Sequence, residues 1–278
     1  MVRDELWVCH LGTIPYLDAV ALQEHVREQR QAGELPDTLL LLEHPAVYTR
    51  GRRSAEGELP FDEDFYRVRG IDLVETDRGG RLTYHGPGQL VGYPIMGVTD
   101  IGLHLRTMEA ALVSALGEEG IGARSRTDEG PDYTGVWVGP RKIASIGVHV
   151  SKGISTHGFA VNVVNDLDPF SWVVACGLPD VAMTSIASEI RSDSHTGLPC
   201  FRRHMAHAFC RAHGRRQRLV SPRRLGIDAP IASTRGWMPR ARPPRTSSRC
   251  ADAGRSLIGQ ESPIQMTPRV ATVDGARG

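Results

Sequence analysis

Apolar residues along the chain occur both in strand-like runs and at helical spacing. Residues 38–43 (TLLLLE) form a short continuous apolar run, which predicts a buried strand ended by His44-Pro45. Residues 16–31 and 103–116 place apolar side chains three or four positions apart, which predicts a helix over each. A second strand is expected over residues 71–76, and a late helix over residues 200–212.

Three further strand-like runs follow one another closely, at residues 135–138, 143–150 and 158–164. Gly139-Pro140 and residues 151–153 supply the turns between them. Strands and helices therefore interleave without a strict strand–helix–strand repeat. This order predicts an α/β (α+β) fold with a mixed sheet flanked by helices.

The character of the chain changes near residue 215. Residues 1–200 carry 28 Asp and Glu against 17 Lys and Arg, whereas residues 201–278 carry 4 against 16, all of them arginine. The last part is also rich in Pro, Ser and Gly, and its apolar residues show no sustained period. We expect a catalytic domain over residues 1–214 and a disordered basic tail over residues 215–278.

Targeting signals and paired cysteines are not evident in the sequence. No run approaches the roughly 20 apolar residues of a membrane span, and residues 1–10 lack the regions of a secretory signal, so a cytoplasmic location is expected. The five cysteines (Cys9, Cys176, Cys200, Cys210 and Cys250) are far apart. We expect free thiols, with neither a disulfide framework nor a metal site.

The most unusual stretch is RGGRLTYHGPGQL, residues 78–90. Its glycines allow the backbone to approach a ligand closely, and Arg78, Thr83, His85 and Gln89 offer polar groups around it. A tight surface loop with a hydrogen-bonding histidine would explain the same residues. A phosphate-binding loop is a weaker interpretation, because neither GxGxxG nor GxxxxGK[ST] is present.

Two residues are candidates for nucleophilic chemistry. Cys176 follows an apolar run and precedes Gly177, at a turn where substrate could reach a thiol, although a buried core thiol is the simpler interpretation. Lys142 is one of only two lysines in the chain, the other being Lys152. It is either a solvated strand-start residue or a lysine that stabilises a thiolate.

Histidines offer an alternative to Lys142. His149 and His157 flank the turn at Ser151 and fit hydrogen-bonded strand-end positions better than catalytic ones. A Cys–His nucleophile pair using His85 remains the rival arrangement for Cys176.

Three long blocks resemble the lipoyl(octanoyl) transferases, and the resemblance covers roughly residues 5–213. The blocks are RGGRLTYHGPGQLVGYPI (78–95), GVWVGPRKIASIGVHVS through THGFAVN (135–162) and ACGLPDVAMTSIASE (175–189), and LLLLEHPAVYTRGRR (39–53) matches the family's N-terminal signature. Departures are small: Ala175 replaces a common proline, and Leu-Pro-Asp follows Gly177 in place of a more glycine-rich run.

The resemblance implies a biotin/lipoate protein ligase-like fold and a two-step acyl transfer without cofactor or metal. Cys176 would accept octanoate as a thioester from octanoyl-acyl carrier protein, with Lys142 as its partner. Lysines of lipoyl domains in 2-oxoacid dehydrogenase complexes and of the glycine cleavage H protein would then take the acyl group. The implied acyl-binding residues are Arg78, Gly79, Gly80, Arg81, Leu82, Thr83, Tyr84, His85, Ser145, Ile146, Gly147, Gly158, Phe159 and Ala160.

Other functions remain open from the sequence. A lipoyl amidotransferase or an ATP-dependent lipoate ligase would share the fold, although the ligase would not need Cys176 and no strong nucleotide motif is present. A third reading is a carrier-binding module without activity, which the intact Lys142 and Cys176 disfavour. The basic tail is either inert or an arm attracted to acidic partners, and neither a membrane nor a nucleic-acid partner is expected.

Overall fold

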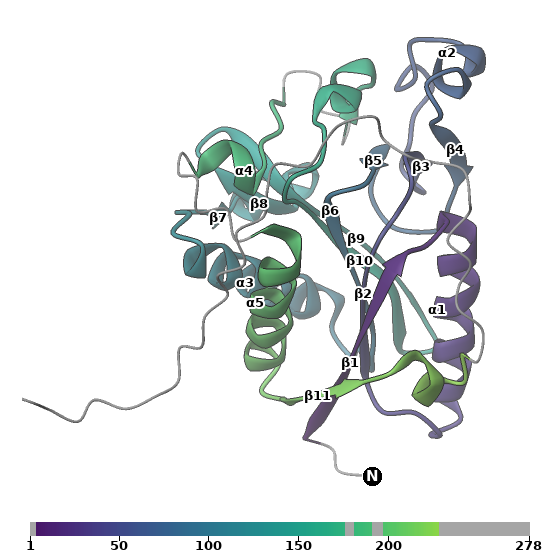
Figure 1. Ribbon diagram of the computed structural model, residues 1–278, viewed down its shortest axis with the longest axis vertical. Coiled ribbons are helices and arrows are strands. Elements are labelled where there is room, and N and C mark those ends of the chain that lie inside the picture. The colour runs from purple at the N-terminus through teal and green to yellow at the C-terminus, as the bar shows by residue number, and fades with distance from the viewer. Residues whose placement is uncertain (1–3, 176–180, 191–196, 228–278) are drawn as a thin grey trace, which may run out of the picture. The chain divides into compact units, whose positions relative to one another are not determined.

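The computed structural model describes residues 4–175, 181–190 and 197–227. Contacts divide the chain into a unit over residues 1–240 and a unit over residues 241–278, the second lying wholly outside the described residues. The described part contains a mixed sheet flanked by helices, so the predicted fold class is confirmed (Figure 1).

The larger sheet has eight strands in the described residues, in the order β11-β1-β2-β6-β10-β9-β8-β7. Strands β1 (Glu5–Thr13), β2 (Thr38–Glu43) and β11 (Arg216–Val220) run parallel to one another. The others pair antiparallel: β6 (Gln89–Ile95), β10 (Ile154–Asn162), β9 (Arg141–Ser151), β8 (Gly135–Val138) and β7 (Arg124–Ser125).

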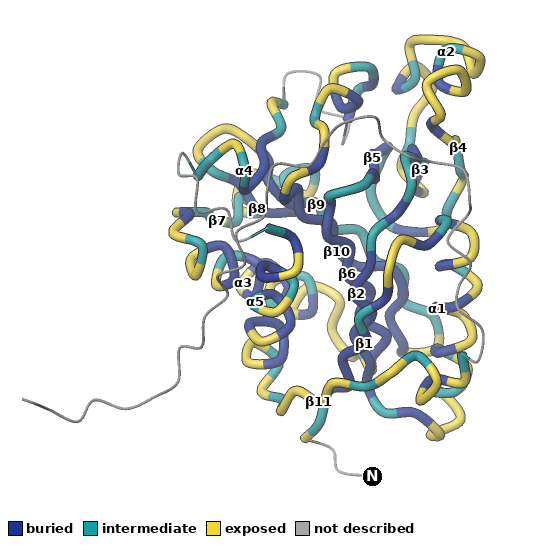
Figure 2. Tube along the Cα trace, viewed as in Figure 1, coloured by how far each residue is buried: buried dark blue, intermediate teal, exposed yellow. Residues whose placement is uncertain are grey.

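Helices cover both faces of this sheet, as Figure 1 shows. The helix α1 (Tyr16–Gln31) packs on one face, against Leu40 and Leu42. Helices α3 (Ile101–Glu118) and α5 (Gly197–Ala212) pack on the other face, against Leu39 and Leu41. The alternation of neighbouring leucines between the two cores explains why β2 contains four leucines in a row, since each face of the strand is buried (Figure 2).

A smaller sheet, in the order β4-β3-β5, lies beside the larger one. It consists of β4 (Asp72–Glu75), β3 (Val47–Arg50) and β5 (Thr83–His85). Its core includes Tyr48, Leu82 and Tyr84, joined by Tyr66 of helix α2 (Glu63–Arg67) and Phe170 of the 3₁₀ turn η3 (Asp168–Trp172). These rings pack edge-on or tilted, with centroids 5.3–5.4 Å apart.

The remaining elements are short. Two 3₁₀ turns, η1 (Thr127–Glu129) and η2 (Pro131–Tyr133), connect β7 to β8. The helix α4 (Ile186–Glu189) is capped by the Ser185 side chain, which accepts from Ser188 N, and η5 (Pro222–Leu225) follows β11. Residues 216–227, beyond the expected boundary at residue 214, thus pack on the larger sheet; the rest of the expected tail, residues 228–278, lies outside the described residues.

The structure also bears on the predictions that the cysteines are free thiols and that no segment spans a membrane. Cys9 and Cys210 are buried free thiols, and burial raises the pKa of each to about 11, which fits packing residues. Cys200 is disulfide-bonded, so the expectation of a free thiol is wrong there. No helix in residues 4–175, 181–190 and 197–227 is long and apolar enough to cross a membrane.

Candidate active site

A pocket lies where the smaller sheet meets β6, β9 and β10 of the larger one. It is lined by residues from segments far apart in sequence, including the start of α1, the turn after β3 and η2. The lining residues are Tyr16, Arg53, Arg78, Gly80, Arg81, Thr83, His85, Val91, Tyr93, Pro131, Asp132, Thr134, Lys142, Ser145, Ile146, Gly147, His157, Gly158, Phe159 and Ala160.

Most of the residues singled out from the sequence meet in this pocket. Of the three proposed acyl-binding segments, residues 145–147 and 158–160 line it completely, as do Arg78, Gly80, Arg81, Thr83 and His85 of the first. Leu82 and Tyr84 instead point into the core of the smaller sheet, because alternate strand residues face opposite sides. Gly79 supports the wall, since its N–H donates to Val148 O at 2.9 Å.

Glycines let the two walls of the pocket approach each other. A Cβ on Gly147 would lie 2.5 Å from Gly79 O, and a Cβ on Gly158 would lie 2.2 Å from Gly92 O. Only glycine fits where these backbones pass so closely.

Lys142 is buried at one end of the pocket, with 2% of its surface exposed. Its Nζ lies 5.3 Å from the centre of the Trp137 ring, its partner in the β8–β9 ladder. On the other side, the Lys142 N–H donates to Ala182 O and Thr184 N–H donates to Lys142 O, both at 2.9 Å. The strand residue therefore lies between Trp137 and the segment that begins at residue 181.

Cys176 lies outside the described residues, so its distance from Lys142 or His85 is not given by the structure. The described residues on either side of it are placed. Ala175 is buried in the core of the smaller sheet, and Ala182 accepts the hydrogen bond from Lys142. The Cys–Lys pair and its rival Cys–His pair both remain predictions.

His85 is a neutral, fixed side chain. Burial lowers its pKa well below 6.5, and the nearby His44 acts in the same direction. Gln89 Nε2 donates to Asn162 Oδ1 at 2.9 Å and to Tyr84 O at 3.1 Å. Gln89 Oε1 is then left to accept from His85 Nδ1–H at 2.8 Å, which places the proton on Nδ1.

A wall of uncharged rings surrounds His85. Tyr16 stacks on it with centroids 5.9 Å apart, and His44 approaches it edge-on at 5.6 Å. His44 Nδ1 faces Ile14 O and its Nε2 faces the Tyr93 hydroxyl, both at 2.7 Å, while burial lowers the pKa of His44 to about 4. Burial raises the pKa of Tyr93 well above 10, so this wall presents neutral surface to a ligand.

Charged side chains at the pocket are held in place by neighbours. Arg78 is buried and donates to Thr49 O at 2.6 Å and to Thr49 Oγ1 at 2.8 Å. His157 Nε2 lies 2.7 Å from Asp77 Oδ1, and His149 Nε2 lies 3.6 Å from Asp77 Oδ2. Burial is the largest single influence on Asp77 and acts to raise its pKa, but the hydrogen bond with His157 and the nearby His157 and His149 together lower this pKa below its usual value.

Several lining residues are not among the acyl-binding residues expected from the sequence. Tyr16, Arg53, Val91, Tyr93, Pro131, Asp132 and Thr134 lie outside the proposed segments, and His157 had been assigned only a strand-end role. Alternation along β6 would have indicated that Val91 and Tyr93 share a face. Among the described residues, no group of three or more His, Cys, Asp or Glu side chains is arranged to hold a metal ion.

Comparison with known proteins identifies the family of this chain. Residues 15–209 match the lipoyl protein ligase A/B catalytic domain. An octanoyltransferase of Solibacter usitatus is 43% identical over 203 residues, covering 72% of this chain and 90% of that protein. An octanoyltransferase of Mycobacterium avium is 45% identical over 193 residues, covering 66% of this chain and 78% of that protein.

Solved structures show the same fold. A putative lipoate protein ligase from T. acidophilum with bound lipoic acid matches with a TM-score of 0.63 and 20% identity, over 80% of this chain and 92% of that one. A lipoate-protein ligase A bound with ATP matches with a TM-score of 0.61 and 19% identity, over 81% and 92%. The chain therefore belongs to the octanoyltransferase family, acyltransferases built on the lipoyl protein ligase A/B catalytic domain.

Proposed function

We propose that the protein transfers an octanoyl group from octanoyl-acyl carrier protein, through a thioester on Cys176, to a lysine of a lipoyl domain. The acceptors would be the lipoyl domains of 2-oxoacid dehydrogenase complexes and the glycine cleavage H protein, all in the cytoplasm. The observation that carries the proposal is a buried lysine, Lys142, in a pocket that uncharged rings also line. That pocket suits an aliphatic chain, and the relatives named octanoyltransferase point to its length.

In the first step, the Cys176 thiolate attacks the carbonyl carbon of the donor thioester. The carbon–sulfur bond to the carrier breaks, and the carrier leaves as a thiol after taking up a proton. Exchange between two thioesters is nearly balanced, so this step chiefly needs a thiolate. A free thiol has a pKa of about 8.5, and a nearby lysine cation favours its ionised form.

In the second step, the acceptor's ε-amino group attacks the acyl-enzyme. An amide forms, the bond to the Cys176 sulfur breaks, and the amine loses one proton to the Cys–Lys pair. Lysine can exchange this proton, whereas arginine cannot. Amide formation from a thioester is downhill and drives the cycle without ATP.

Donor preference tests the proposal against its rivals. Purified protein and apo lipoyl domain would be mixed with octanoyl-acyl carrier protein, with free octanoate plus ATP, or with octanoylated H protein, and acceptor mass recorded. The proposal expects acceptor octanoylation with the carrier-protein donor alone. Modification only with octanoate and ATP would identify a ligase, and modification only with the octanoylated H protein would identify an amidotransferase.

A further inference from the structure

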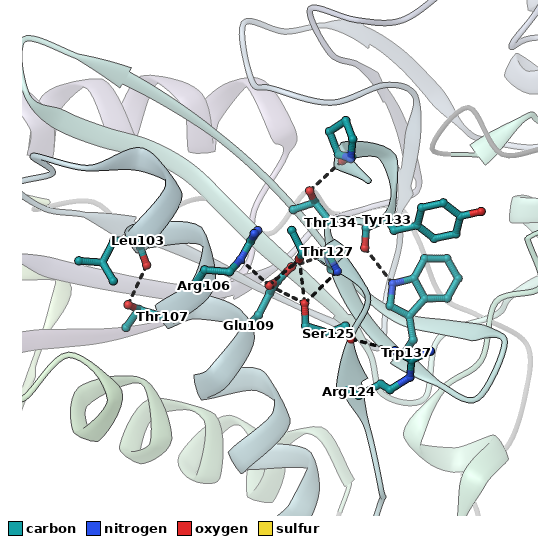
Figure 3. A network of polar contacts seen from close by, with 12 residues as sticks. Leu103, Arg106, Thr107, Glu109, Arg124, Ser125, Thr127, Tyr133, Thr134 and Trp137 are labelled. Atoms are coloured by element: carbon teal, nitrogen blue, oxygen red, sulfur yellow. Dashed lines mark hydrogen bonds and ion pairs between the residues drawn. The ribbon is translucent and has the colours of Figure 1, made fainter. Parts of the chain in front are cut away.

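A buried carboxylate on α3 gathers hydrogen bonds from the pocket rim. Glu109 is 2% exposed and lies on the face of the helix that carries Met108 and Leu112 into the core. Its oxygens accept from Ser125 Oγ at 2.7 Å, Thr127 Oγ1 at 2.9 Å and Gly135 N at 3.0 Å (Figure 3). Arg106 Nε, one turn earlier on the helix, lies 2.8 Å away. These partners offset the cost of burying the charge.

The three rim partners bracket the segment that holds η1 and η2. Ser125 and Thr127 stand at its start and Gly135 at its end, so one carboxylate ties both ends together. Neither 3₁₀ turn contributes a buried residue, so polar contacts hold the segment together with the Tyr133 ring, which packs on Trp137 with centroids 5.7 Å apart. Between the ties, Pro131, Asp132 and Thr134 line the pocket.

The segment also contacts another part of the pocket lining. Asp132 Oδ1 lies 3.2 Å from Arg53 Nη1, and both residues line the pocket although they are far apart in the sequence. The position of η2 therefore shapes this part of the pocket lining.

The Gly135 end of the tie contacts Lys142. A Cβ at Gly135 would lie 2.8 Å from Lys142 Cε and 2.4 Å from Ala144 O, so the lysine chain runs directly against this backbone. Trp137, two residues further along β8, presents its ring to Lys142 Nζ. A shift of the Gly135 backbone would thus be felt at the Lys142 ammonium.

We propose that Glu109 is a positioning residue for acyl transfer, which fixes both the rim segment 125–135 and the side chain of Lys142. The proposal rests on the proposed function, in which Lys142 serves the reaction. A carboxylate is required because Ser125, Thr127 and Gly135 all present donors to it. A glutamine of the same shape would turn an NH₂ group toward at least one of them.

The test compares Glu109→Gln with Glu119→Gln. Glu119 follows α3, its side chain is 2% exposed like that of Glu109, and it lies 2.6 Å from His204 Nδ1; neither residue lines the pocket. The first readout is acetylation of Lys142 relative to Lys152 by acetic anhydride, followed by peptide mass spectrometry from pH 6 to 10. Lys152 is exposed and serves as the internal reference, and this readout does not require the enzyme to be active.

Glu109→Gln should raise the relative labelling of Lys142 at least about fivefold and change its pH profile, while Glu119→Gln leaves both as in the wild type. Steady-state transfer should show a higher donor KM and a lower kcat for Glu109→Gln alone. The positioning role is overturned if Glu109→Gln labels like the wild type, or if both variants change labelling equally. A labelling change in a protein that transfers nothing would instead disprove the proposed function and leave the contact with Lys142 standing.

Discussion

The ammonium nitrogen of Lys142 lies 5.3 Å from the centre of the Trp137 ring, and both side chains are buried. A cation facing an aromatic ring is stabilised by roughly 0.5–2 kcal/mol, which helps to offset the loss of water around the charge. The sheet ladder and the strand-like segment at residues 182–184 hold the lysine backbone from two sides. This arrangement fixes Lys142 in the pocket to which we assign the acyl chain.

Replacing Lys142 should slow acyl transfer in a protein that still folds. Lys142→Met keeps the length of the side chain and removes its amine, so the variant should still fold. Loss of the proton-transfer group should slow octanoyl transfer by about 100-fold or more. Lys142→Arg should also be slow because a guanidinium does not release its proton.

The measurement is transfer to apo lipoyl domain, alongside urea unfolding of each variant. The exposed Lys152→Met is the matched control and should transfer at the wild-type rate. A folded Lys142→Met protein that keeps more than a tenth of the wild-type rate would contradict the role given to this lysine.

Gly147→Ala should damage the pocket wall. The new methyl group would lie 2.5 Å from Gly79 O, so the Gly79 backbone and the adjoining Arg78 must move. Overpacking of this kind costs about 1–3 kcal/mol of unfolding free energy, and the donor KM should rise. Gly117→Ala in α3, where nothing lies within 4 Å of the added carbon, should instead stabilise the protein by about 0.5–1 kcal/mol. Urea denaturation measures the unfolding free energy of both variants. A Gly147→Ala protein as stable as the wild type would contradict the prediction that the backbone at Gly79 resists displacement.

Buried histidines should make the fold sensitive to mild acid. Burial lowers the pKa of His44 and of His104 to about 4, below the usual 6.5. The unfolded chain takes up these protons at higher pH than the folded chain, so their contribution to stability is complete above pH 6.5. It is lost as pH falls from about 6.5 to about 4, at roughly 1.4 kcal/mol per pH unit for each histidine.

His104 is the clean test of that slope, because its Nε2 is buried without a hydrogen-bond partner. His104→Met should lower the slope of unfolding free energy against pH, because about one proton fewer is taken up on unfolding over this range. Urea unfolding at half-unit steps from pH 7 to 4.5 measures it. An unchanged slope in the variant would mean that His104 titrates alike in the folded and unfolded chains.

Strong local patterns predicted much of the fold. The helix expected over residues 16–31 and the strand over 38–43 match α1 and β2, because amphipathic spacing and a doubly buried leucine run leave little choice. β6 was not predicted, since Gly92 and Pro94 interrupt its strand signal. Gly92 is needed there because a Cβ would lie 2.2 Å from the Phe159 ring, a contact made by a residue 67 positions away. From the sequence, β11 was assigned to the basic tail, because its arginines give no strand signal and its partner, β1, lies at the other end of the domain sequence.

The site was predicted in part, again where the local sequence is distinctive. Residues 78–85, 142–147 and 158–160 have distinctive sequences, and the pocket contains most of them. Tyr16 and Asp132 come from an ordinary helix start and an ordinary loop, and only the tertiary fold carries them to the pocket. Glu109 was not singled out from the sequence, and its burial becomes evident only when the segment 125–135 is placed against α3.

The central claim, a covalent acyl-enzyme on Cys176, is tested most directly by intact-protein mass. The full chain would be mixed with octanoyl-acyl carrier protein without ATP, digested to locate any adduct, and then given apo lipoyl domain. The account predicts one octanoyl group on the peptide containing Cys176, lost as the lipoyl domain gains it, and no such adduct in Cys176→Ala. Full transfer activity in Cys176→Ala, or an acceptor that gains octanoate while the enzyme never carries it, would contradict the covalent mechanism.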